Sequence, residues 1–229
     1  MKKDLAEQVL AARAARRPVA LLTWLASGDQ RLVSPEDTAE LPGLADTLAE
    51  AFRLDRSGTV ETPEGEVFIR VFNPPLRMII VGAVHAAQFL LPLARMIGHD
   101  VTIIDPRTAF ASEERFPDAD LVAEWPDEAI ARIGIDRRTA LIALTHDAKI
   151  DDPAIRLGLE RGAFYVGALG SGRTHAKRVE RLKAAGVSEA ELARIHAPIG
   201  LDIGAQGPAE IALSIMAEVV AVLRGKAAG

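Results

Sequence analysis

Short apolar runs alternate with longer amphipathic segments through residues 74–229. The apolar runs, which predict buried strands, are Met78–Val81, Val101–Ile104, a short run near Leu121, Ala140–Leu144 and Ala163–Leu169. Between them, apolar residues recur at three- and four-residue spacing, as in helices with one buried face. Strands that alternate with helices predict a parallel, doubly wound sheet, so we expect a Rossmann-like domain with the strand order 3-2-1-4-5.

Proline and glycine mark the ends of the expected helices. A helix over His85–Ile97 contains Pro92, which should kink or break it. Pro126 lies in the first turn of the next helix, and Asp151–Pro153 is expected to start another. A final helix should begin at Gly207–Pro208 and bury one apolar face.

Residues 1–73 show a different pattern, without regular alternation of strand and helix. We expect helices over Leu5–Arg17 and Leu44–Leu54, a strand over Val19–Leu25 and a hairpin that ends in Glu66–Phe72. The segment Asn73-Pro74-Pro75 then interrupts both helix and central strand. The sequence therefore predicts an α/β protein with a small N-terminal α+β domain, residues 1–73, and a Rossmann-like C-terminal domain, residues 74–229.

Composition and charge narrow the range of functions. With 229 residues, 49% of them hydrophobic, the chain can bury a large core. Its net charge of −5 argues against nucleic acid as a partner, because phosphate neutralisation needs a basic surface. The absence of cysteine excludes disulfides, thiolate metal sites and cysteine catalysis within this chain. Neither a signal peptide nor a membrane-spanning run is recognisable, so we expect a cytoplasmic protein without a membrane partner.

The first strand of the C-terminal domain leads into a helix through a glycine turn, Gly82-Ala83-Val84-His85-Ala86-Ala87. This is the place of the dinucleotide fingerprint G-x-G-x-x-G/A, in which Gly82 and Ala87 fit but Val84 replaces the second glycine. Asp105, at the end of the second strand, has the place of the acid that binds a ribose. The alternatives are an anion at the helix N-terminus, with His85 as a donor, or a purely structural turn.

Polar residues also follow the fourth strand, in Thr145-His146-Asp147. The first and fourth strands flank the point where the strand order reverses, so His85 and His146 are expected to face one crevice. Histidines beside an aspartate can bind a metal or exchange protons. The alternative is a solvated loop in which Asp147 and the acids after it cap the next helix.

The fifth strand ends in a glycine-rich turn, Gly167-Ala168-Leu169-Gly170-Ser171, before a basic helix. Arg173, Lys177 and Arg181 recur every four residues and share one helix face. Free amides, the helix dipole and a guanidinium together favour a phosphate over a merely solvated face. The glycine-rich segment 197–205 is expected either to line the same crevice or to be structural. No metal-ligand spacing, P-loop or Ser-His-Asp order stands out.

Taken together, these motifs resemble those of the xanthine dehydrogenase accessory factors (XdhC/CoxI type). The matching segments, which lie between Pro74 and Leu223, are Ile79–Gln88, Val101–Arg107, Leu144–Asp152, Tyr165–Arg178, His196–Ala205 and Glu210–Glu218. The candidate cofactor-binding residues are Gly82, Ala83, Val84, His85, Gln88, Asp105, Arg107, Thr145, His146, Asp147, Gly167, Gly170, Ser171, Arg173 and Lys177.

The resemblance implies a chaperone for the molybdenum cofactor that has no catalytic residues of its own. Such proteins bind molybdopterin, protect it while a cysteine desulfurase supplies its sulfido ligand, and deliver it to an apo-molybdenum hydroxylase, such as xanthine dehydrogenase or carbon monoxide dehydrogenase. A homodimer is expected because two-fold assemblies are common. The glycine–cysteine motif usual in the family's N-terminal domain is not found here, which indicates a shortened variant.

Two other functions remain open at this point. An NAD(P)-dependent oxidoreductase would use Asp105 for the ribose and His146 as acid or base, but Val84 argues against it. A scaffold protein that binds no ligand would not need the glycine-rich and basic residues at 167–178.

Overall fold

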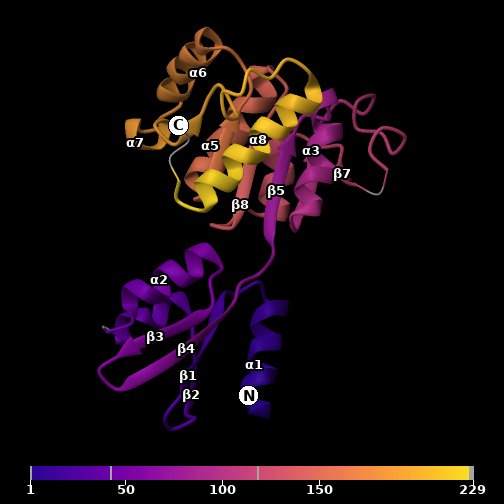
Figure 1. Cartoon of the computed structure of the whole chain (residues 1–229). Helices are drawn as coiled ribbons and strands as arrows, with labels where there is room; N and C mark the ends of the chain where they lie inside the picture. Colours follow the sequence, from indigo (N-terminus) through magenta and orange to yellow (C-terminus); the bar gives the residue numbers. More distant parts are fainter. Residues whose placement is uncertain (1, 42, 118, 227–229) are drawn as a thin grey trace. The chain divides into compact units, whose positions relative to one another are not determined.

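The computed structural model describes residues 2–41, 43–117 and 119–226. The chain divides into two compact units, Met1–Pro74 and Pro75–Gly229 (Figure 1). No helix within these described ranges is long and apolar enough to cross a membrane.

The first unit is built on a four-stranded antiparallel sheet with the order β2-β1-β4-β3. Its elements are α1 (Lys3–Ala14), β1 (Val19–Trp24), β2 (Gln30–Val33), the 3-10 helix η1 (Pro35–Glu40), α2 (Ala45–Leu54), β3 (Gly58–Thr62) and β4 (Gly65–Phe72). Leu22, Leu48 and Ile69 belong to the cluster that forms its core. The expected small α+β unit is thus confirmed.

The second unit is built on a parallel sheet of six strands. Its elements are β5 (Leu76–Val81), α3 (His85–Met96), β6 (His99–Ile104), β7 (Asp120–Val122), α4 (Pro126–Ile133), β8 (Thr139–Ala143), α5 (Ala148–Glu160), β9 (Tyr165–Ala168), α6 (Gly172–Ala184), α7 (Glu189–Leu192), β10 (Ile195–His196) and α8 (Pro208–Leu223). The strand order β10-β9-β8-β5-β6-β7 confirms the predicted doubly wound sheet. Sequence analysis missed β10, because two residues carry no periodicity.

Apolar side chains cover both faces of this sheet, because alternate residues of a strand point to opposite sides. Ile79 and Val81 join a cluster with residues of α4 and α5, whereas Met78 and Ile80 join one with α3 and α8. Figure 1 shows α3 and α8 side by side. Since both faces are covered by helices, the strand ends are the parts of the sheet left for a ligand.

Two helices differ from their predicted form at proline. α3 continues through Pro92 without a break. α5 begins at Ala148, ahead of the predicted start, and contains Pro153 in its interior. The early start has a local cause: the Asp147 side chain accepts a hydrogen bond from the amide of Lys149 (2.9 Å) and so caps the helix.

Candidate functional site

The polar loops predicted from the sequence meet at one edge of the parallel sheet. β5 lies between β6 and β8, and β9 lies on the other side of β8. Because the strands are parallel, the turn after β5 and the loops after β8 and β9 all leave from this edge. The strand order reverses between β5 and β8, where ligands bind in such sheets.

Gly82 makes a close approach between two of these loops. Its φ is +112°, a conformation that residues with a Cβ rarely adopt. A Cβ on Gly82 would lie 2.7 Å from Thr145 Cγ2 and 3.3 Å from the Thr145 nitrogen. The turn after β5 can therefore lie against the loop after β8 only with glycine at this position.

The backbone of Ala83 is bonded within the protein. Its N–H donates to Asp105 Oδ2 (2.9 Å), and its carbonyl accepts from Arg115 Nη1 (2.8 Å). Val84 is the N-cap residue of α3, and none of the described side chains caps this helix. Val84 also packs against the α3–α8 cluster, which accounts for a valine in the second glycine position. An anion would thus meet the first-turn amides of α3 rather than the amide of Ala83.

Asp105 is a fully buried partner of the turn and not an open carboxylate. Besides the Ala83 amide, it binds the backbone N–H and the guanidinium of Arg107, with distances of 2.8–3.0 Å. Burial opposes its ionisation, but these hydrogen bonds and the charge of Arg107 hold the pKa of Asp105 below its ordinary value. A ribose could use this carboxylate only by replacing those bonds.

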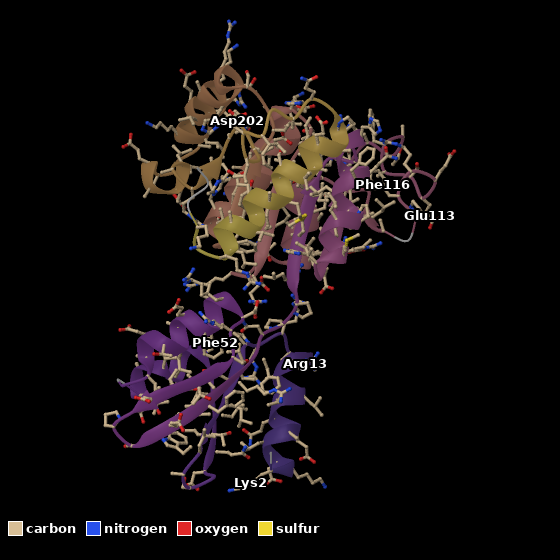
Figure 2. All side chains as sticks on the ribbon, in the orientation of Figure 1. Lys2, Arg13, Phe52, Glu113, Phe116 and Asp202 are labelled. Atoms are coloured by element: carbon tan, nitrogen blue, oxygen red, sulfur yellow. The ribbon has the colours of Figure 1, made fainter. Side chains whose placement is uncertain are left out.

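The loop between β6 and β7 folds back over the turn. Gln88 Nε2 donates to the carbonyl of Arg115 (3.1 Å), and the guanidiniums of Arg107 and Arg115 lie 4.4 and 5.8 Å from the ring centroid of Phe110. In Figure 2 the labelled Phe116 of this loop lies toward the body of the unit, in agreement with its burial. Sequence analysis missed Arg115, because an arginine in an irregular loop belongs to no motif or periodicity.

His146 and Gly170 bring the loops after β8 and β9 together. His146 has a left-handed backbone, with φ at +62°, and a Cβ on Gly170 would lie 3.7 Å from its Nδ1. The ring of His85 instead lies against Phe89 of its own helix, with centroids 5.4 Å apart. The structure therefore joins His146 to the loop after β9, and the shared crevice with His85 stays a prediction.

The acids after β8 have different roles. Asp147 is the helix cap that the structural alternative predicted. Asp151 lies in the first turn of the helix, but its side chain is buried and accepts a hydrogen bond from Thr145 Oγ1 (2.7 Å). Thr145 therefore serves the internal bonding of the loop, a role that adjacent sequence does not reveal.

The start of α6 carries exposed cations. Ser171 caps the helix with its side chain, and Arg173 and Lys177 are exposed in the first two turns. Arg181, predicted on the same face, is bonded to Asp152 instead (Nε to Oδ2, 2.6 Å). The anion site suggested by the sequence is thus reduced from three cations to Arg173 and Lys177.

Gly167, a candidate binding residue, is buried inside β9. A Cβ at this position would lie 2.5 Å from Ile199 Cδ1 and 2.6 Å from Tyr165 Cε1. Its role in the fold is therefore to make room for packing between β9 and the segment after β10, and a binding role for Gly167 stays a prediction.

Glu218 of α8 anchors the segment 197–205. It accepts hydrogen bonds from the Tyr165 hydroxyl and from the Gly200 amide (2.7 Å), and it lies 3.1 Å from His196 Nδ1. Burial opposes its charge, but these partners hold the pKa of Glu218 below its ordinary value. Sequence analysis missed this residue, although an acid on the apolar face of the final helix is a signal for such a role.

Fold and loops together define a Rossmann-like domain that departs from the dinucleotide fingerprint at Val84. Within the described parts of the chain, no group of three or more His, Cys, Asp or Glu side chains could hold a metal ion. Residues 78–219 match the XdhC Rossmann domain. The chain belongs to the XdhC family.

Curated relatives agree with this assignment. The molybdenum cofactor insertion chaperone PaoD of Escherichia coli K12 is 35% identical over 151 residues, which are 66% of this chain and 41% of PaoD. A Bacillus subtilis protein named as a probable subunit of xanthine dehydrogenase is 32% identical over 155 residues, 67% of this chain and 45% of that protein. The chain thus spans less than half the length of these curated relatives.

A crystal structure described as a xanthine dehydrogenase from Bacillus halodurans covers 98% of this chain with a TM-score of 0.70, and the match covers 65% of that protein. At 22% sequence identity, this similarity supports the fold alone.

Proposed function

We propose that this chain is an accessory protein that binds the molybdenum cofactor and assists its insertion into a molybdenum hydroxylase. The names of its relatives support the proposal, since one is a cofactor insertion chaperone and another a probable component of xanthine dehydrogenase. An apo-hydroxylase as client, a cysteine desulfurase as partner and a second copy of the chain are parts of the same proposal.

The observation that carries the proposal is the convergence of anion-binding features at one sheet edge. The uncapped N-terminus of α3 follows Gly82, the loop with His146 contacts the loop with Gly170, and Arg173 and Lys177 are exposed at the start of α6. Molybdopterin is a flat, polar molecule with a phosphate. Helix N-termini and a guanidinium would bind that phosphate through free amides and charge-assisted hydrogen bonds.

The glycines of this edge fit such a ligand. A Cβ on Gly82 would collide with Thr145, and one on Gly170 would lie 3.0 Å from Thr174 Cγ2. These glycines therefore allow the loops to lie close together. The N–H of Gly82 itself donates to the carbonyl of Ile104 (2.8 Å), so a phosphate would meet the first-turn amides of α3 and α6 instead. Two observations favour a pterin ligand over a nicotinamide dinucleotide. Asp105 is bonded within the protein, and Val84 replaces the glycine that admits a pyrophosphate.

Ligand release from protein purified from a molybdenum-replete host tests the proposal. Denatured wild-type protein should release a pterin that fluoresces after oxidation. A double variant with Arg173→Glu and Lys177→Glu should carry at least about tenfold less, because charge-assisted contacts contribute roughly 1.5–3 kcal/mol each. Lys183→Glu, in the last turn of the same helix, is the matched control and should keep the wild-type content.

Different results would contradict the assigned anion site and the proposed function. Unchanged pterin content in the double variant would contradict the assigned anion site. Release of NAD(P), or of no ligand, by the wild-type protein would contradict the function itself. Binding of purified apo-hydroxylase, and light scattering for a second copy, then test the partners.

A further inference from the structure

A buried pair of opposite charges lies beneath the loops of the candidate site. Asp151 of α5 is 1% exposed and Arg178 of α6 is 2% exposed. Neither belongs to the helix caps or to the exposed cations described above. Because a buried charge is costly unless it is bonded, the partners of this pair indicate what it does.

Asp151 holds the loop after β8. Its carboxylate accepts hydrogen bonds from Oγ1 and N–H of Thr145 (2.7 and 3.3 Å) and from the N–H of His146 (3.0 Å). These bonds restrain the loop at the point where His146 has its left-handed backbone. A single carboxylate thus holds the backbone of His146, whose ring lies beside Gly170.

Arg178 holds the loop after β9. Its Nη2 donates to the carbonyl of Leu169 (3.0 Å), next to Gly170. The same Nη2 lies 3.9 Å from Asp151 Oδ2, too far for a hydrogen bond but close enough for strong attraction in a buried site. The pair therefore links from beneath the two loops that meet at His146 and Gly170.

Stability alone gives little reason for such a pair. Nε and Nη1 of Arg178 are buried and have no hydrogen-bond partner among the described residues. Burial lowers the pKa of Arg178 and raises the pKa of Asp151, so both groups bear the cost of losing water. An apolar pair would avoid that cost. The half-exposed ion pair of Arg181 with Asp152 already joins the same two helices.

We propose that Asp151 and Arg178 are positioning residues, which orient the loops after β8 and β9 so that His146 and the first turn of α6 face the same anion. The identity of that anion rests on the proposed function. The positioning role rests on the contacts of the pair and can be tested with inorganic phosphate alone.

Phosphate titration of the isotope-labelled full chain, followed through backbone amide shifts, measures the effect at the site. Asp151→Asn and Arg178→Met should each weaken binding at the amides of 170–173 by about tenfold or more. Their effects should not add, because both break the same linkage. Arg181→Gln removes the exposed ion pair between the same helices and should change the affinity by less than about twofold.

Amide hydrogen exchange supplies a readout that does not depend on any ligand. In Asp151→Asn the N–H of His146 should exchange about tenfold faster or more, because it loses a bond to a charged acceptor. Arg181→Gln should leave this rate unchanged. If Asp151→Asn or Arg178→Met fails to fold, Arg178→Lys serves instead. It keeps the charge on a shorter side chain, which should lengthen the contacts with Leu169 and Asp151 and weaken phosphate binding about threefold.

Three results would overturn the proposal: wild-type phosphate affinity in folded Asp151→Asn and Arg178→Met (or in Arg178→Lys), equal losses in Arg181→Gln, or no saturable shifts at 170–173 in the wild-type protein. If phosphate and exchange behave as expected but no pterin is found in the wild-type protein, the proposed function fails and the positioning role stands.

Discussion

Replacing Gly82 with alanine tests whether the turn after β5 and the loop after β8 are held in close contact. At φ +112°, backbone strain for an alanine costs about 1–3 kcal/mol. The new Cβ would also lie 2.7 Å from Thr145 Cγ2 and 3.3 Å from the Thr145 nitrogen, an overpacking that costs about 1–3 kcal/mol. We expect the free energy of unfolding to fall by roughly 2–6 kcal/mol in total.

Gly98, just beyond the other end of α3, provides the control. Its φ is +90°, and a Cβ there would meet nothing within 4 Å. Gly98→Ala therefore shares the backbone strain but not the collision, and it should cost only about 1–3 kcal/mol. Thr145→Ser removes Cγ2 and keeps the hydroxyl, so it should recover about 1 kcal/mol in the Gly82→Ala background.

Native-state hydrogen exchange of the β5 and β8 amides in the full chain reports the stability of the second unit directly. Equal losses for Gly82→Ala and Gly98→Ala would refute the argument from close contact. A Thr145→Ser change that restores nothing would show that the collision with the backbone, not with the methyl group, decides the cost.

Three further predictions concern buried groups. Glu218→Gln should lower the free energy of unfolding by about 1–3 kcal/mol near neutral pH. Because hydrogen bonds depress the folded-state pKa of Glu218, this stabilisation should be full above about pH 4.3 and lost as the pH falls through the folded-state pKa, so that urea titrations of the two proteins converge in acid. Gly167→Ala should lower the free energy of unfolding in urea by about 1–3 kcal/mol, and Ile199→Val should restore part of that loss. Gly58→Ala is the control: a Cβ there meets open space, so the free energy of unfolding should not change. Asp105→Asn should lower the free energy of unfolding by about 1.5–3 kcal/mol, because the turn loses hydrogen bonds to a charged acceptor. An unchanged midpoint of thermal unfolding would contradict this bonding.

Much of the fold of the second unit could be predicted, because its signals are local. A buried parallel strand such as Met78–Val81 is a continuous apolar run, and the rules for doubly wound sheets then restrict the order of the strands. The unbroken course of α3 through Pro92 and the presence of β10 were less predictable, and both have physical reasons. Packing against the sheet can hold a helix through a proline, and a two-residue strand exists only because β9 pairs with it.

The candidate site also contains features that could be predicted from the sequence and features that could not. Asp147 acts within a few residues of its own position, so its capping role could be predicted from local spacing. Asp105 was recognised by its place in the chain, but the hydrogen bond that it accepts from the Ala83 amide could not be predicted from the sequence. Arg178 and Glu218 were not singled out from the sequence, because their contacts depend on partners contributed by other elements.

The candidate site is assembled from three distant stretches of chain, the turn at Gly82, the loop at Thr145–Asp147 and the start of α6. None of them has its geometry before the sheet forms, so a ligand bound there favours the folded state by mass action. At a ligand concentration of 100 times Kd, this linkage amounts to about 2.7 kcal/mol. A carrier that hands over its cargo loses that stabilisation at the same moment. If the chain carries the cofactor as proposed, its empty form should be degraded by proteases sooner than its loaded form.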